Sequence, residues 1–270
     1  MPFLHFHLYP DKIVVESNED GFTKENVEAI CKTGDSTKST TEGYIGEKGI
    51  GFKSVFKVAK KVHVQSGYFS FVFVYDKDSE DDGLGIVTPL DGEYETDLKI
   101  DVRTRITLTL LEPDKFISLV GEFLAIPDSL LLFLTRLTTL EVTVHHKGSD
   151  PYNVKYRHEK IDGGEKARII KTATGKMQET KDFYIQKNLV SNLPPDRARE
   201  YTNEEGVVVA INKAQIVLAF PVDQNNNPIM ENQYTYAYLP IRQVGFNVRN
   251  NLFTLQAYKF GCRINIAISF

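Results

Sequence analysis

Apolar and polar residues alternate with a period of two in several short segments, which predicts strands. HFHLYPDKIVVES (5–17) predicts two short strands that turn at Pro10 and Asp11. TRITLTLL (104–111) alternates strictly, so that its isoleucine and leucines share one face. Further strands are predicted at 62–66, 68–75 and 138–146, the first two adjacent and antiparallel.

Three segments carry the spacing of helices instead. TKENVEAICK (23–32) has apolar residues at helical intervals, with Thr23 as N-cap and Asn26 at the third helical position. GIGFKSVFKVAKK (49–61) predicts a helix with an apolar stripe. FISLVGEFLAIPDSLLLFL (116–134) predicts two buried helices, the second capped by Asp128. The stripe of the second helix consists of Phe52, Val55, Phe56 and Ala59.

The pattern changes to a succession of β-rich segments from about residue 148. They include PYNVKYRHE, ARIIKTAT, DFYIQKN, VVVAINK, QIVLAFPV and YTYAYLPI. We therefore place a domain boundary at 147–149, which gives a first domain over 1–147 and a β-rich second domain over 148–270.

Composition restricts the class of protein. With 41% hydrophobic and 25% charged residues, 270 residues are enough to bury a real core. A net charge of -4 argues against a nucleic-acid partner. Acidic residues and a proline interrupt the most apolar stretch, so we expect no membrane span. Two distant cysteines and the absence of a signal-peptide pattern favour an intracellular protein, cytoplasmic or nuclear.

Glycines are concentrated in GYIGEKGIGFKSVF (43–56), directly before the second predicted helix. Helix N-termini bind phosphate through unpaired backbone N–H groups, and glycine lets the backbone approach the anion. The Walker A pattern fits poorly because the lysine comes one place late. The Rossmann pattern lacks its preceding strand. A loop whose glycines serve only packing remains an alternative.

The order of the motifs is more informative than the glycines alone. KIVVES, NEDGF, a helix, GDSTKST, GEKGIGF and a second helix follow one another over residues 12–66. This order resembles the GHKL, or Bergerat, ATP-binding family of heat-shock chaperone ATPases, MutL and gyrase B, especially its sacsin and NO VEIN branch. The resemblance implies an α+β fold for 1–147. That fold is a Bergerat-type α/β sandwich, in which helices cover one face of a mixed, mainly antiparallel sheet.

The same resemblance implies an ATP site. The turn after the first strand would hold adenine, with Ser17 where the family usually has Asp, and Thr104 would reach the adenine edge through water. A lid over residues 34–48 and the glycine loop would hold the phosphates. The implied ATP-binding residues are Ser17, Asn18, Gly21, Thr37, Lys38, Gly46, Gly49, Ile50, Gly51, Phe52 and Thr104. An ordinary turn, a solvated loop and a strand threonine are the alternatives for these segments.

Hydrolysis in this family depends on a Glu and a Mg²⁺-binding Asn, both on a helix before the first strand. MPFLHFHLYPD (1–11) does not have the pattern of such a helix. We therefore predict no catalytic residue in the chain, although ATP with Mg²⁺ is the family's ligand. Such a chain would be a fragment or a degenerate nucleotide binder. YTYAYLPIRQVGF (234–246) resembles a segment that follows the ATPase domain in sacsin-like proteins, and the tail after it does not.

Histidines occur in two pairs, His5 with His7 and His145 with His146. A metal site needs three or four converging ligands, and no such set stands out, so we predict none. The resulting hypothesis is an ATP-binding module of a chaperone-like protein, whose partners are ATP, other domains of a longer protein or client proteins. The alternative is a non-catalytic interaction or scaffold domain that keeps the GHKL shape without nucleotide.

Overall fold

The computed structural model falls into two compact units, which are described separately. Unit 1 comprises 1–126, 139–155 and 173–176, and unit 2 comprises 127–138, 156–172 and 177–270. The boundary predicted at 147–149 stays a prediction. The structure describes residues 1–31, 52–74, 89–92, 98–134, 136–192, 200–202, 208–210, 213–229, 233–237, 239–244 and 267–269.

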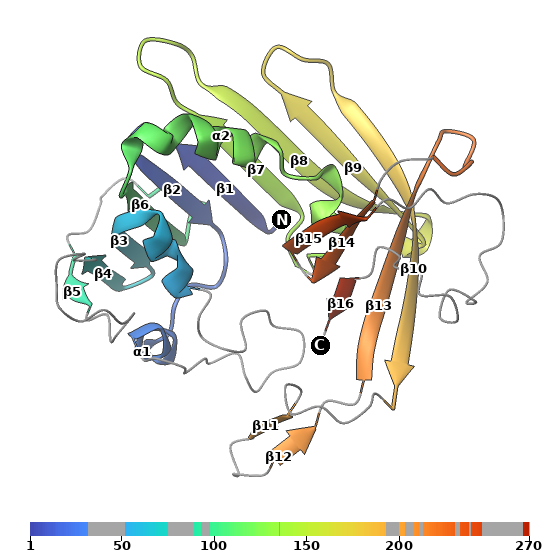
Figure 1. Cartoon of the computed structure of the whole chain (residues 1–270), viewed down its shortest axis with the longest axis horizontal. Coiled ribbons are helices and arrows are strands. Elements are labelled where there is room, and N and C mark those ends of the chain that lie inside the picture. Colours follow the sequence, from blue (N-terminus) through green and yellow to red (C-terminus); the bar gives the residue numbers. More distant parts are fainter. Residues whose placement is uncertain are drawn as a thin grey trace. The chain divides into compact units, whose positions relative to one another are not determined.

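Strands are the main regular elements in the described part of unit 1 (Figure 1). They are β1 (Phe3–Leu8), β2 (Lys12–Ser17), β3 (Ala59–Ser66), β4 (Phe69–Val74), β5 (Leu90–Asp91), β6 (Thr104–Leu110), β7 (Thr139–Val144) and the first part of β8 (Tyr152–Ile161). The helices are α1 (Lys24–Cys31), α2 (Phe116–Leu124) and the 3₁₀ helices η1 (Phe52–Lys57) and η2 (Pro113–Lys115).

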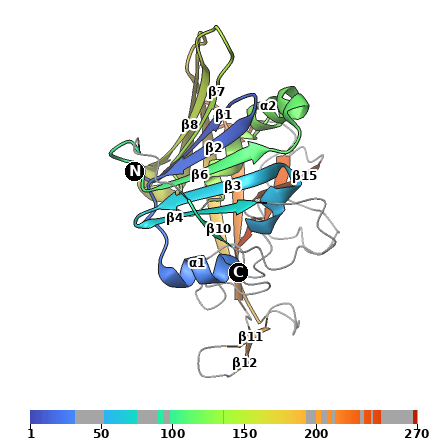
Figure 2. The same ribbon diagram turned by 90° about the vertical axis from the view of Figure 1, so that its left-hand side faces the viewer.

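The sheet of this unit is mixed, with strand order β7-β1-β2-β6-β3-β4-β5 (Figure 2). β1 lies parallel to β7, whereas β1–β2, β2–β6, β6–β3, β3–β4 and β4–β5 are antiparallel. β1 and β2 turn through backbone hydrogen bonds between Tyr9 and Lys12, which confirms the predicted pair of strands.

Alternation along each strand separates an apolar face from a polar one. The apolar face contains the fully buried side chains of Val62, Val64 and Phe73. Side chains of α2 and η1 pack on this face, among them Phe116 and Phe56. Burial of these side chains is the main source of stability of the unit.

Helix α1 begins as its sequence predicts. The Asn26 N–H donates to Thr23 Oγ1 at 3.3 Å, and the Thr23 N–H donates to Asn26 Oδ1 at 3.0 Å. These two reciprocal bonds satisfy backbone donors that a helix N-terminus leaves unpaired.

In unit 2, long antiparallel strands dominate the described residues. β9 (Lys166–Ala173) pairs with β10 (Glu179–Ser191), and β10 pairs with β13 (Lys213–Val222) over ten positions. Ile169 and Phe183 are buried, while Arg168 and Asp182 form a two-pronged ion pair across the strands. The remaining elements are η3 (Asp128–Leu132), η4 (Asp162–Gly164), β11 (Glu200–Thr202), β12 (Val208–Ala210), β14 (Gln233–Ala237), β15 (Leu239–Val244) and β16 (Ala267–Ser269).

The predicted fold class, a Bergerat-type α/β sandwich with helices on one face, is wrong. Among the described residues, sixteen strands stand against two α-helices of eight and nine residues. Strand pairing, not a helical layer, therefore dominates the fold.

Two predicted helices account for much of this difference. The helix expected over 49–61 is described only as the short η1, after which Ala59 begins β3 and pairs with β6. The stripe of Phe52, Val55, Phe56 and Ala59 does face the core. After α2, the second expected helix is the short η3. Asp128 does not cap it and instead binds Lys171 Nζ at 3.2 Å.

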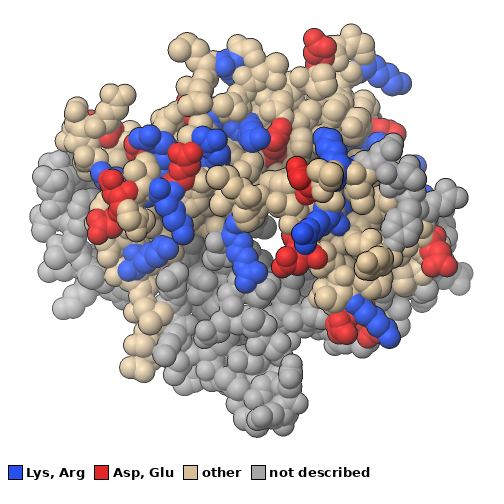
Figure 3. Space-filling view, turned by 180° about the vertical axis from the view of Figure 1, so that it is seen from behind, with Lys and Arg blue, Asp and Glu red and all other residues tan. Residues whose placement is uncertain are grey.

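The described helices include none with the length and apolar character needed to cross a bilayer. On the face drawn in Figure 3, basic and acidic side chains are interspersed.

Replacement of Phe73 by alanine should destabilise the protein strongly, because its ring is inaccessible and contacts the rings of Phe52, Phe56 and Phe71. We expect a loss of about 3–5 kcal/mol in the free energy of unfolding, measured by urea denaturation. Val74→Ala is the matched control, since the neighbouring Val74 points to the other face and is 53% exposed. Equal losses for the two variants would contradict the assignment of faces.

Candidate functional site

Three hydroxyl side chains lie in a row across neighbouring strands on the otherwise apolar face. Ser17 at the end of β2 is directly opposite Thr104 at the start of β6, and Thr104 is opposite Ser66 at the end of β3. Thr104 and Ser66 are buried, and Ser17 is half-buried. We call these residues the hydroxyl row.

Hydrogen bonds connect this row to the turn that follows β2. The Ser66 and Thr104 hydroxyl oxygens are 2.7 Å apart, and the Phe22 N–H donates to Ser66 Oγ at 2.8 Å. The bond between the hydroxyls uses one of their two hydrogens. The second hydroxyl hydrogen of the pair needs another acceptor.

Gly21 is the residue of the turn whose backbone demands glycine. Its φ is +89°, in the region that side chains disfavour, and a Cβ there would lie 3.3 Å from Ser66 Oγ. The absence of a side chain at this position lets the turn approach the hydroxyl row.

The other described residues of the predicted site have different surroundings. Asn18 accepts a hydrogen bond from the Phe3 N–H and donates to the Met1 carbonyl, both at 2.9 Å. Its amide thus fixes the start of β1 to the turn. Phe52 in η1 packs against Phe73 at the edge of the core, with ring centroids 5.7 Å apart.

The structure therefore brings Ser17, Gly21 and Thr104 to one end of the sheet. The remaining predicted residues lie outside the described ones, and their role stays a prediction. They are Thr37, Lys38, Gly46, Gly49, Ile50 and Gly51.

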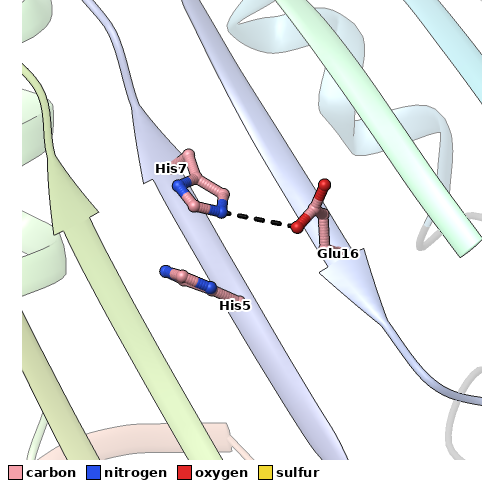
Figure 4. A group of neighbouring side chains, drawn as sticks. All are labelled: His5, His7 and Glu16. Atoms are coloured by element: carbon pink, nitrogen blue, oxygen red, sulfur yellow. Dashed lines mark ion pairs between the residues drawn. The ribbon is translucent and has the colours of Figure 1, made fainter. Parts of the chain in front are cut away.

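A second polar cluster occupies the opposite face of the same strands. His5 and His7 project from β1, and Glu16 lies opposite His5 on β2 (Figure 4). Each of the three offers a ligand atom within 4.8 Å of the other two. We call these residues the histidine–glutamate cluster.

Neighbouring side chains hold the cluster in place. His7 Nδ1 lies 3.2 Å from His145 Nε2, and His5 Nε2 lies 2.8 Å from Thr143 Oγ1. Arg105 donates twice to Glu16 Oε1, at 2.7 and 2.9 Å, which leaves Oε2 directed to His7 Nε2 at 3.5 Å.

These contacts determine the protonation of the cluster at neutral pH. Hydrogen bonding from His7 and then from Arg105 lowers the pKa of Glu16 to about 2, against the effect of burial. Burial, followed by the proximity of His7, lowers the pKa of His5 to about 4. At pH 7 Glu16 is thus a carboxylate and His5 a neutral imidazole.

Sequence reasoning missed both Ser66 and the histidine–glutamate cluster. The sequence shows Ser66 only as a hydroxyl residue at the end of a predicted strand. Its place beside Thr104 follows from the register of β3 against β6, which the sequence does not reveal. The cluster depends on the pairing of β1 with both β2 and β7, and periodicity does not reveal which strands pair.

Comparison with known proteins finds a similar plant sequence. No family model matches the chain. Over 274 residues, covering 90% of this chain, the sequence is 28% identical to Protein NO VEIN of Arabidopsis thaliana. The chain spans only 9% of the length of that protein.

Among solved structures, the chain resembles a "Crystal Structure of N terminal domain of a DNA repair protein". The TM-score is 0.42 at 13% sequence identity, over 89% of this chain and 68% of the other. That score is too low to establish a common fold.

Two glycine substitutions test the geometry of the turn. Gly21→Ala should destabilise the protein by about 1–2 kcal/mol, because alanine is strained at positive φ. Gly121→Ala, in the middle of α2 with open space around the new Cβ, should instead stabilise by about 0.5–1 kcal/mol. Thermal unfolding of both variants measures the difference, and shifts of the same sign would refute the turn geometry.

Proposed function

We propose that this chain is the nucleotide-binding part of a NO VEIN-like protein and that its ligand is ATP. The observation that carries the proposal is the hydroxyl row beside Gly21, at one end of the sheet. The glycine-rich loop follows this turn and α1 in the sequence. The similarity to Protein NO VEIN over 90% of the chain supports the part of the proposal that calls the protein NO VEIN-like.

The chemistry of the hydroxyl row suits a purine edge. A hydroxyl both donates and accepts, whereas adenine presents ring nitrogens as acceptors and an exocyclic amine as donor. The second hydroxyl hydrogen of the Ser66–Thr104 pair is available to a ring nitrogen, directly or through a water. Ser17, the most accessible of the three, would accept from the amine.

The phosphates are assigned to GEKGIGF (46–52) from its sequence. Glycines let phosphate approach the backbone N–H groups of a loop, and Lys48 and Lys53 in the same segment add positive charge. The proposal covers binding of the nucleotide and not its hydrolysis.

Millimolar Mg-ATP should raise the melting temperature of the chain. A ligand at a hundredfold excess over its Kd adds about 2.7 kcal/mol of stability if it binds only the native state. Gly51→Val should abolish the shift, because a branched side chain blocks the approach of phosphate to the backbone. Gly121→Val, at an exposed position of α2, should retain it.

An unchanged melting curve of the wild-type chain at millimolar Mg-ATP would remove the nucleotide proposal. It would favour the alternative, an interaction domain that does not bind nucleotide.

Thr104→Val tests the base-recognition part of the proposal, because it replaces the hydroxyl by a methyl group at nearly constant volume. We expect ATP affinity to fall about tenfold, the effect of one hydrogen bond. The control is Thr107→Val on the same strand, which faces the opposite side of the sheet beside Val14 and His63. Titration calorimetry gives both affinities, and equal affinities would place the base elsewhere.

A further inference from the structure

We propose that the histidine–glutamate cluster of His5, His7 and Glu16 is a binding site for a single divalent transition-metal ion of the Zn²⁺ class. The site lies on the sheet face opposite the hydroxyl row, so it is independent of the proposed nucleotide site. Two imidazoles and one carboxylate, with a position left for solvent, are a common ligand set for Zn²⁺.

The distance between His7 and Glu16 is the first argument. Their facing atoms, Nε2 and Oε2, are 3.5 Å apart, so the hydrogen bond between them is a long one. Bonds of about 2.1 Å at a tetrahedral angle place two zinc ligands about 3.4 Å from each other. The pair is therefore spaced for an ion between its members.

Outer hydrogen-bond partners supply the second argument. Nδ1 of His7 is directed at His145, and Nε2 of His5 is directed at Thr143, with Glu141 at 3.8 Å. In each imidazole one nitrogen is held by a partner and the other is left to bind the ion. This arrangement orients histidine ligands in metalloproteins.

The environment of Glu16 provides the third argument. Arg105 donates two hydrogen bonds to Oε1 and keeps the buried carboxylate ionised and oriented, while Oε2 faces His7 and serves as the ligand atom. The guanidinium charge opposes the entry of further cations, so we infer a single ion. Imidazole nitrogens favour Zn²⁺ over Mg²⁺ or Ca²⁺, which prefer oxygen ligands.

Titration with Zn²⁺ tests the site on the full chain after EDTA treatment and dialysis. We expect one Zn²⁺ per chain, because the cluster offers a single set of three ligand atoms. His7→Asn and His5→Asn should each lower the affinity at least about 100-fold. The control is His146→Asn, which removes an exposed histidine next to His145 and should leave the affinity unchanged.

Wild-type stoichiometry well below one, or cluster variants that bind Zn²⁺ as tightly as the wild type, would overturn the proposal. A second measurement needs no variant: X-ray absorption of the zinc-loaded wild-type chain should show two imidazole ligands and oxygen ligands. A spectrum without imidazole scattering would overturn the proposal even if the variants failed to fold.

Discussion

The antiparallel register of β2 and β6 is the constraint on which the rest of unit 1 depends. It places Ile13 opposite Leu108 on the apolar face and Glu16 opposite Arg105 on the polar face. A slip of one residue would exchange the two faces, because side chains alternate along a strand. The hydrophobic effect fixes this register, since only one arrangement buries the aliphatic residues beneath α2 and η1.

Both candidate sites follow from that register. Alternation puts Ser17 and Thr104 on the apolar face. They stand at the ends of their strands, where the row of apolar residues stops. On the other face, the same pairing brings Arg105 to Glu16, although 89 positions separate them in sequence. The ion pair compensates the buried carboxylate, which would be costly to leave alone. One register thus supports two independent polar sites.

Much of unit 1 could be predicted from the sequence where the signal is local. Alternation identified β1, β2, β6 and β7, and the reciprocal bonds of Thr23 and Asn26 confirm the start of α1. The sequence failed where local signals compete. Residues 52–59 carry helical spacing, yet Ala59 belongs to a strand because pairing with β6 outweighs the helical preference. That competition also explains the wrong fold class.

The polar sites were predictable only in part, because their members converge through non-local pairing. Ser17, Gly21 and Thr104 could be selected from motifs, whereas Ser66 enters through the β3–β6 register. His5 and His7 are visible as an alternating pair, but Glu16 and His145 join them only through strands on either side of β1. Three side chains from two strands have no signature in linear spacing.

The most direct test of this account is the register of β2 against β6, measured by cross-strand nuclear Overhauser effects in the isotope-labelled chain. The account predicts effects between backbone protons of Val15 and Ile106 and of Ser17 and Thr104. Hα–Hα or amide–amide effects that instead join Ser17 to Arg105 and Val15 to Thr107 would show a slipped register and contradict both sites together.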